Sequence, residues 1–380
     1  MSINRILRPR SVRGLFLTAT VVLGAARLAS AGPLISEIYF NPPGGNDVTG
    51  ALEYIELRGD ANMALDNYYF ITLENENDEF NSGTPGEIEN IFNLAGMSFG
   101  SNGYLVLGMK GSLYPGLNGA YDVAAPANPA QPTPAESLKT LGNGAHAYVN
   151  RDTGSGYGNG STSSIGHVGQ NNDLEGSGFT AMLIYVDSKL GGVAPILNDD
   201  LDIGNDGLDL LTGQTGWTIL DSIGVMGETS ETDYGRLYAG VGFGPGITKA
   251  SPGGMEPGST YVNTAPAVLE LEYVARVGTG TSASNWMVAN LTNDGASGYT
   301  NGARNYAISG DHDNLSNPEV YVGSKLGPSP FAYGTDITVT LGADNVGFVV
   351  PEPSSLALLG LGGAIAMAVA VTRRRQPRAS

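Results

Sequence analysis

The segment Leu34-Ile35-Ser36-Glu37-Ile38-Tyr39-Phe40 is rich in residues that favour β-strands, and Asn41-Pro42-Pro43-Gly44-Gly45 follows it directly. Proline fixes φ and lacks an amide donor, so the Pro-Pro-Gly-Gly run predicts a turn after a strand. Similar short runs, separated by glycine, asparagine and proline, cover residues 52–58, 68–73, 88–94, 104–108, 179–186 and 217–225. Short strands at this spacing predict an all-β fold, and specifically a β-sandwich.

Four of these segments, at residues 34–42, 53–57, 103–108 and 217–225, resemble a bacterial lamin-tail domain. That family is an immunoglobulin-like β-sandwich of secreted bacterial proteins, so the resemblance implies this fold for residues 32–240. Residues 114–178 depart from the family pattern, because they hold a proline- and alanine-rich run and a stretch of glycine, serine and asparagine. They are predicted to form a long loop insertion. The family has no agreed catalytic residues, so the resemblance assigns no chemistry.

A second set of short apolar runs covers residues 268–277, 286–291, 305–308, 320–322, 337–341 and 346–350. They predict a second β-rich region over residues 259–349. Residues 240–258, which hold Pro245, Pro252 and Pro257, are predicted to be the boundary. The second region either forms a separate small domain or adds strands to the first, and the sequence leaves both open.

The body of the chain is strongly acidic once its two ends are set aside. Nine of the 19 Lys and Arg residues lie before residue 32 or after residue 372, and residues 32–349, the body of the chain, hold 10 basic against 36 acidic residues. Such a surface repels nucleic acid and anionic lipid, so no nucleic-acid partner is expected. The chain has no cysteine, which excludes disulfides, thiolate metal sites and a cysteine nucleophile.

The first 31 residues have the three parts of a secretory signal peptide. Four arginines between Arg5 and Arg13 form a basic region, residues 15–26 form an apolar stretch, and Ala29-Ser30-Ala31 is a small-x-small cleavage site. This order predicts cleavage after Ala31 and export of the remaining chain.

The last residues also combine three parts in a fixed order. Val350-Pro351-Glu352-Pro353-Ser354-Ser355 comes first, an uncharged stretch follows at residues 356–372, and Arg373-Arg374-Arg375 comes next. As a helix, the uncharged stretch reaches roughly 25 Å, just enough for a thin hydrocarbon core. The arginines hold its end on the cytoplasmic side. Residues 356–372 are therefore predicted to form a C-terminal transmembrane helix within a sorting segment at residues 350–380.

This order resembles the PEP-CTERM sorting signal, with Pro351, Glu352 and Pro353 as the sorting motif. The resemblance implies an exosortase-type membrane protease as a partner, which cuts near the motif and passes the protein to the surface. The chain is thus expected to be exported, anchored in the membrane before processing, and at the cell surface or extracellular afterwards. The family occurs in bacteria that make exopolysaccharide, so such a polymer is a candidate partner.

The densest group of hard oxygen ligands is Asp-Asp-Leu-Asp-Ile-Gly-Asn-Asp-Gly-Leu-Asp at residues 199–209. Alternating carboxylates and a glycine turn can converge on one Ca²⁺, which makes Asp200, Asp202, Asp206 and Asp209 candidate metal ligands. The EF-hand pattern fails, because Gly204 stands at a ligand position and no glutamate closes the loop. A solvated acidic loop with turn-forming residues is the alternative, and no other cofactor is expected.

The segment Gly96-Met97-Ser98-Phe99-Gly100 matches the pattern of a nucleophile elbow. Such an elbow needs a preceding strand, a following helix and a histidine base. A turn and a strand are predicted after Gly100 instead, so the sequence favours a glycine-rich loop. The histidines of the chain are His146, His167 and His312, and the last of them, flanked by Asp311 and Asp313, is also a candidate for metal contact.

These features together predict a secreted, surface-sorted and non-enzymatic protein, a structural or binding module of the cell envelope or extracellular matrix. The alternative is a secreted hydrolase with an unrecognised site. Three histidines and no cysteine count against that class, but paired Asp or Glu residues suffice for glycoside hydrolysis.

If Asp200, Asp202 and Asp206 share a Ca²⁺ ion, calcium should raise the melting temperature, because a ligand that binds only the folded state stabilises it. The Asp202→Ala variant should then show no calcium response. Thermal unfolding with millimolar calcium or a chelator measures both. An unchanged melting temperature of the unsubstituted chain would rule out the site.

Overall fold

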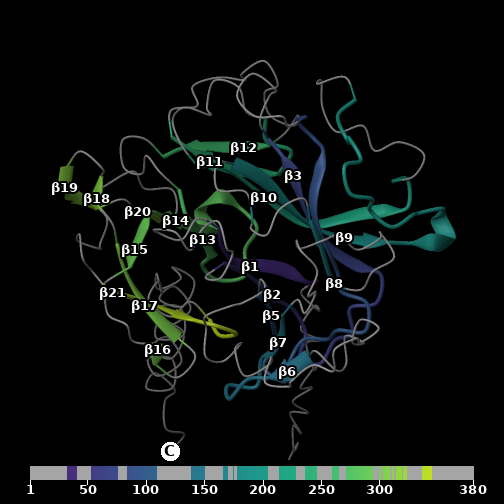
Figure 1. The fold of residues 1–380 in the computed structure, drawn as a ribbon, viewed down its shortest axis with the longest axis horizontal. Coiled ribbons are helices and arrows are strands. Elements are labelled where there is room, and N and C mark those ends of the chain that lie inside the picture. Colours follow the sequence, from purple (N-terminus) through teal and green to yellow (C-terminus); the bar gives the residue numbers. More distant parts are fainter. Residues whose placement is uncertain are drawn as a thin grey trace, which may run out of the picture. The chain divides into compact units, whose positions relative to one another are not determined.

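The computed structural model describes residues 32–40, 53–75, 84–108, 138–149, 166–169, 174, 178–203, 214–227, 236–245, 259–264, 271–293, 299–300, 303–308, 310–311, 314–318, 320–322 and 336–344. By its internal contacts the chain divides into two units, Met1–Ala31 and Gly32–Ser380, and all described residues belong to the second. The regular structure of these residues is almost entirely β-strand (Figure 1). Two short 3₁₀ helices, η2 (Ser188–Leu190) and η4 (Ala283–Asn285), interrupt it. The all-β prediction is therefore confirmed.

One sheet has eight strands. Their order is β20 (Val320–Val322), β14 (Trp286–Ala289), β13 (Tyr273–Arg276), β1 (Leu34–Tyr39), β2 (Tyr54–Arg58), β5 (Tyr104–Gly108), β7 (His146–Val149) and β6 (Leu138–Thr140). Neighbouring strands are antiparallel except β5 and β7, which run parallel.

The second sheet has seven strands. Their order is β12 (Thr260–Asn263), β11 (Val241–Gly244), β10 (Trp217–Met226), β9 (Gly178–Val186), β3 (Tyr68–Glu74), β4 (Ile88–Asn93) and β8 (Gly166–Gly169). The pairs β10–β11 and β11–β12 are parallel and the others antiparallel. Both sheets are therefore mixed.

Two smaller sheets lie in the C-terminal part. One joins β15 (Leu291–Asn293), β16 (Tyr299–Thr300) and β21 (Asp336–Thr340) to β17 (Ala303–Ile308). The other pairs β18 (Gly310–Asp311) with β19 (Asn314–Pro318).

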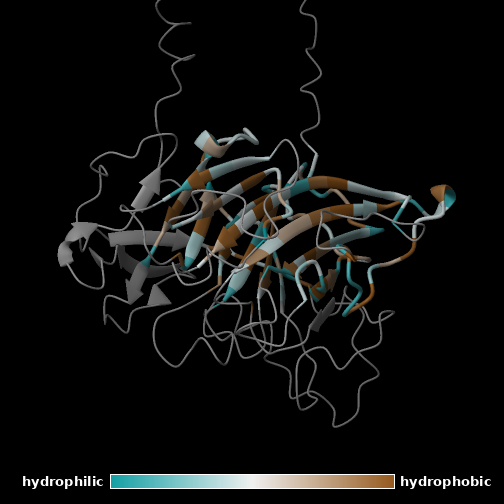
Figure 2. Cartoon of the chain, turned by 90° about the horizontal axis from the view of Figure 1, so that it is seen from above, coloured by the Kyte–Doolittle hydropathy of each residue, from teal (hydrophilic) through white to brown (hydrophobic). Residues whose placement is uncertain are grey.

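The two large sheets share one hydrophobic core. It takes Ile55 and Leu107 from the eight-stranded sheet, and Phe70 and Val225 from the seven-stranded sheet, all fully buried. Figure 2 shows the apolar segments concentrated along the strands. Because residues on a strand alternate between its two faces, Ile55 turns to this core while Glu56 turns to the other side of the sheet. The molecule is thus two layers of sheet around a common core.

Most strands expected in the first part of the chain are confirmed within two residues at their ends. Three others, β6, β7 and β8, lie inside residues 114–178, where a loop insertion was predicted. These strands have only three or four residues each, which is too short to show a clear alternating pattern. The segment predicted to be the boundary also contains a strand, β11, whose Val241 and Phe243 are buried.

Strands on both sides of residues 246–258 belong to the same sheet. β13 pairs with β1, with Glu37 opposite Ala275, and β14 pairs with β13. Part of the second predicted β-rich region therefore adds strands to the sheet that contains β1. The predicted strand at residues 346–350 lies outside the described residues.

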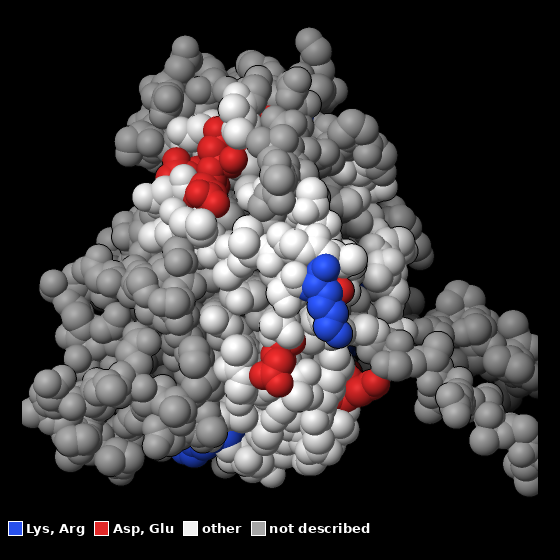
Figure 3. All heavy atoms as spheres, turned by 90° about the vertical axis from the view of Figure 1, so that its right-hand side faces the viewer, with Lys and Arg blue, Asp and Glu red and all other residues white. Residues whose placement is uncertain are grey.

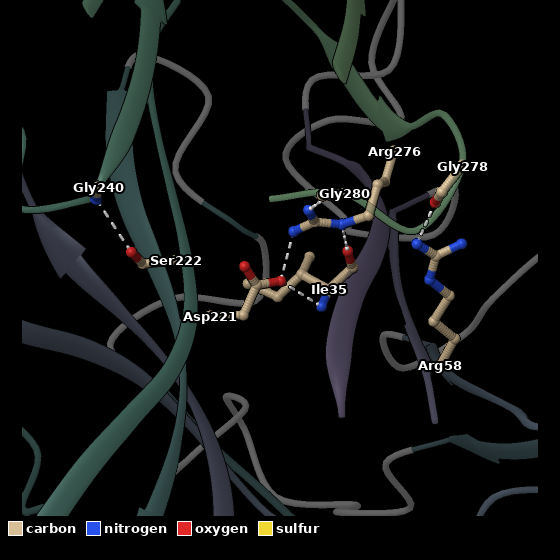
Figure 4. Close-up of polar contacts among 8 residues, drawn as sticks. All are labelled: Ile35, Arg58, Asp221, Ser222, Gly240, Arg276, Gly278 and Gly280. Carbon is tan, nitrogen blue, oxygen red and sulfur yellow. Dashed lines mark hydrogen bonds and ion pairs between the residues drawn. The ribbon is translucent and has the colours of Figure 1, made fainter. Parts of the chain in front are cut away.

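A buried ion pair connects the two sheets (Figure 4). Arg276 on β13 places Nη2 2.5 Å from Oδ2 of Asp221 on β10. The same Asp221 oxygen accepts a hydrogen bond from the amide of Ile35, while Arg276 Nε donates to the carbonyl of Ile35. The guanidinium also stacks on the ring of Trp286, 4.1 Å from its centroid.

The register of the sheet explains this arrangement. The β1–β13 ladder ends at Glu37, so Ile35 lies beyond it and its backbone groups need other partners. A bulge between Ile219 and Asp221 changes which side chains of β10 face the core. Burial raises the pKa of Asp221, and Arg276 and the Ile35 amide oppose that rise. Burial likewise lowers the pKa of Arg276, and Asp221 opposes it.

We expect Arg276→Met to lower the free energy of unfolding by about 3–5 kcal/mol, because it leaves the Asp221 charge buried without its partner. Adding Asp221→Asn should recover part of that loss, since the amide removes the charge but keeps an oxygen for the Ile35 amide. Urea unfolding of both variants, with exposed Lys189→Met as the control, measures the coupling. Simple additivity of the two substitutions would contradict the role of the pair.

Candidate functional site

The residues that precede the C-terminal segment are held against one end of the eight-stranded sheet. The amide of Gly342 donates to Glu56 Oε2 at 2.6 Å, and Tyr104 donates its hydroxyl to Asp344 Oδ1. Asn102 Nδ2 donates to the carbonyl of Gly342 at 2.7 Å. Asn143 Nδ2 donates to the carbonyls of residues 341 and 342, at 2.9 and 3.1 Å. We call Glu56, Asn102, Tyr104 and Asn143 the C-terminal clamp.

Neighbouring strands bring the clamp residues together. Glu56 lies on β2, Tyr104 begins β5, and Asn143 lies in the turn before β7, and these three strands are consecutive in the sheet. Gly342 has a φ of +75°, and a Cβ there would lie 2.2 Å from the Cβ of Ala145. Only glycine fits this close approach without a rearrangement.

Two Asn-Gly turns supply the amide donors of the clamp. Asn102 and Asn143 each precede a glycine with positive φ, at Gly103 and Gly144. The side-chain oxygen of each accepts from the amide two residues on, at Tyr104 and Ala145. This bond fixes the side chain in an Asx turn and leaves its nitrogen to donate elsewhere.

Glu56 also belongs to a pair of buried carboxyl groups. Glu37 lies directly opposite it on β1, and both side chains are fully buried. Tyr54 donates its hydroxyl to Glu37 Oε1. Burial and the nearby Glu37 raise the pKa of Glu56 well above its usual value, while the Gly342 amide, Ser36 and Arg58 oppose the rise.

Tyrosine rings lie on the same face of the sheet as this pair. The ring of Tyr39 meets those of Tyr54 and Tyr273 edge to face, with centroids 6.2 and 6.0 Å apart. Burial, together with the hydrogen bond to Asp344, raises the pKa of Tyr104. The clamp therefore sits at the edge of a buried acidic and aromatic face, where a hydrogen bond is stronger than in water.

The structure describes two of the four predicted calcium ligands, Asp200 and Asp202. The amide of Asp202 donates to Asp200 Oδ1, and Asp202 Oδ2 lies 3.3 Å from Arg236 Nη1 and accepts from the Tyr238 hydroxyl at 2.8 Å. Burial and this bond raise the pKa of Tyr238. Asp202 therefore has a structural role that accounts for its burial without a metal.

The other two predicted ligands, Asp206 and Asp209, lie outside the described residues. Within the described part of the chain, no group of three or more His, Cys, Asp or Glu residues could hold a metal ion. Figure 3 shows one face, on which acidic side chains form separate clusters. Calcium binding by this loop stays a prediction.

The structure brings Ser98 and His146 together, although the sequence favoured a plain loop there. His146 Nδ1 lies 2.9 Å from the Ser98 carbonyl oxygen and 3.2 Å from Ser98 Oγ. A nitrogen that close to a carbonyl acts as a donor, so Nδ1 carries the proton and does not remove one from Oγ. A turn and β5 follow Gly100, so the strand-to-helix context of a nucleophile elbow is missing.

The remaining histidines add no described site. The structure does not describe the side chain of His167, on β8, or the positions of His312 and Asp313. Asp311 is the last residue of β18.

The sequence interpretation missed the C-terminal clamp entirely. Its one visible signal was the pair of Asn-Gly dipeptides, which predict turns but do not say what the asparagine nitrogens contact.

The motif comparison concerns the segment that follows the clamp. Residues 349–375 match the PEP-CTERM protein-sorting motif. The match includes Pro351, Glu352 and Pro353 and the arginine cluster. Proteins with this motif are processed by exosortase, a membrane protein, so the match indicates an exported protein sorted toward the cell surface.

Comparison with curated proteins and with solved structures gives no match. The lamin-tail resemblance therefore stays a prediction. Among the described residues no helix is long and apolar enough to span a membrane. The predicted transmembrane helix at residues 356–372 and the cleavage site at Ala31 lie outside the described residues.

The raised pKa of Glu56 predicts a pH dependence of stability. The folded state keeps a proton that the unfolded state releases near pH 4.5, so stability is present below that pH and falls as the pH rises toward the folded-state pKa. Glu56→Gln, which stays neutral, should flatten this fall and raise the melting temperature at pH 8 by a few degrees, roughly the effect of 1 kcal/mol. Melting temperatures from pH 4 to 8, with exposed Asp60→Asn as the control, test this. Equal slopes in wild type and Glu56→Gln would contradict it.

Proposed function

We propose that this protein is a non-enzymatic structural or binding module of the cell envelope or extracellular matrix, delivered by an exosortase-type system. The observation that carries the proposal is the PEP-CTERM match at residues 349–375. A sorting signal at the C-terminus commits the preceding residues to work outside the cell. The finer fold assignment within this proposal is an immunoglobulin-like, lamin-tail-like sandwich.

The body of the chain supports a binding or structural role. Its 36 acidic residues against 10 basic ones favour solubility and cations over anionic partners. The two large mixed sheets present extended surfaces, and exopolysaccharide is the candidate partner. Calcium held by the acidic loop belongs to the same proposal.

A carboxylate-based hydrolase is the second candidate, and the Glu37–Glu56 pair is the observation that favours it. The two residues are directly opposite on neighbouring strands, and burial and the nearby Glu37 raise the pKa of Glu56. A substrate would have to reach them, however, and both are 0% exposed. Their contacts with Tyr54 and Gly342 also explain them as structural residues. The non-enzymatic role is therefore preferred.

Replacing Glu352 with Ala should leave export and membrane insertion intact but block processing, because the hydrophobic stretch and the arginines are unchanged. The full-length chain should then accumulate in the membrane fraction. Mass spectrometry of the C-terminus of the surface protein, in wild type and variant, makes the comparison. Mature wild-type protein that still carries residues 373–380 would mean that the segment is a plain tail anchor.

A further inference from the structure

One segment, which follows β9, carries the exposed apolar side chains of the described structure. In the part of the chain that the structure describes, four large apolar side chains are 44–68% exposed: Leu190, Val193, Ile196 and Ile203. All four lie within residues 187–203, which we call the outer arm. Single exposed apolar residues are common on any surface, but their concentration in one segment indicates an interaction site.

Hydrogen bonds and apolar packing hold the outer arm in place. The indole Nε1 of Trp217, the first residue of β10, donates to the carbonyl of Val193 at 2.6 Å. The amide of Asn198 donates to the carbonyl of Ile88 on β4 at 2.9 Å. Leu197 packs on the apolar cluster that covers the sheet face away from the shared core. The exposed side chains are therefore positioned before any partner arrives, which lowers the entropy cost of binding.

The outer arm carries opposite charges on the two sides of its apolar centre. Lys189, in η2 at the end of β9 (Figure 1), and Asp199 are ten residues apart. Val193 and Ile196 lie between them. Lys189 is exposed, and among the described residues none forms an ion pair with it. An order of basic, apolar and acidic residues is self-complementary, because two such segments match when they run antiparallel about a two-fold axis.

We propose that the outer arm is the interface of a two-fold symmetric dimer, in which it packs antiparallel against the same arm of a second copy of this chain. Each Lys189 then faces the partner's Asp199, and each Val193 faces the partner's Ile196. The apolar contacts supply most of the affinity, while the exposed ion pairs fix the direction of the two arms. This inference goes beyond the proposed surface role, because it gives one face of the module a partner.

A second copy fits the outer arm better than other classes of partner. The acidic body repels anionic lipid. The four exposed side chains are aliphatic, so they offer a polysaccharide no hydrogen bonds. A protein partner would need apolar side chains between an acidic and a basic group at matching spacing, and the arm itself has that order.

Introduced cysteines test the contact, because the chain has none of its own. Full-length Val193→Cys and Ile196→Cys chains of different tag length are purified in detergent, mixed and oxidised with a copper catalyst. Non-reducing electrophoresis then measures the mixed disulfide dimer. A disulfide needs Cβ atoms about 3.5–4.5 Å apart, so this mixture should give at least about tenfold more mixed dimer than Thr140→Cys with Ile196→Cys. Thr140 is exposed on β6, in the other large sheet.

Charge reversal tests the direction of the arms. Lys189→Glu and Asp199→Lys should each weaken dimerisation at least about tenfold, because like charges then face each other in every pair of identical copies. Mixing the two variants should restore the affinity to within about threefold of the unsubstituted chain, since each reversed charge meets an opposite one in the mixed dimer. Sedimentation equilibrium of the full-length chains in detergent measures the dissociation constants, and thermal unfolding of each variant shows that the sheets still form.

The possible results separate clearly. Mixed disulfide dimers no more abundant than in the Thr140→Cys mixture would overturn the proposal, as would an unsubstituted chain that sediments as a monomer at every concentration. Two charge variants that stay weak when mixed would overturn the antiparallel arrangement. The chains are purified at full length, so a failure of sorting or processing leaves these measurements unaffected.

Discussion

The contact between Arg276 and Asp221 is the interaction on which the joining of the two sheets depends. Apolar packing holds the sheets together without direction, but this ion pair fixes where β13 lies over β10. It also supplies Ile35 with hydrogen bonds after the β1–β13 ladder has ended. The chain has no cysteine, so no covalent bond can serve that purpose.

Two of the few basic residues of this acidic chain neutralise buried carboxylates. Arg276 and Arg236 are both buried in ion pairs, with Asp221 and Asp202. Arg58 donates to the carbonyl of Gly278 in the turn after β13. Burying a carboxylate without such a partner costs several kcal/mol. The acidic loop is thus tied to the seven-stranded sheet through Asp202, whatever its other residues bind.

Strands rich in β-favouring residues could be predicted from the sequence, but which strands pair with each other could not. The segments around Ile55 and Phe70 are of this kind and form β2 and β3. β11 and β8 are short and rich in glycine, so their extended structure depends on neighbours that are distant in sequence. The same holds for the clamp, because Glu56 and Gly342 are 286 residues apart and no local pattern connects them.

The burial of two glutamates could not be predicted from the sequence for a different reason. Glu53 and Glu56 appear as breaks in the apolar pattern of β2, which suggests exposure. Both are buried instead, because backbone amides from distant parts of the chain reach them and donate hydrogen bonds. Glu53 accepts from the amide of Leu174 and Glu56 from that of Gly342. A charged residue in a strand is therefore no sign of a solvated face when backbone donors from elsewhere in the chain can reach it.

The energy of the clamp relates the fold to the sorting signal. Five hydrogen bonds at about 0.5–1.5 kcal/mol each give about 2.5–7.5 kcal/mol, which is less than the sum of packing interactions that hold the two large sheets. The clamp can thus open locally while the core around Phe70 and Val225 stays intact. The Gly342 amide favours the charged form of Glu56, whereas burial and the nearby Glu37 favour the neutral form, so the clamp and the buried pair act on Glu56 in opposite directions. Any substitution that loosens the face around Glu56 therefore also loosens the hold on residues 341–342, which lie shortly before the sorting segment in the sequence.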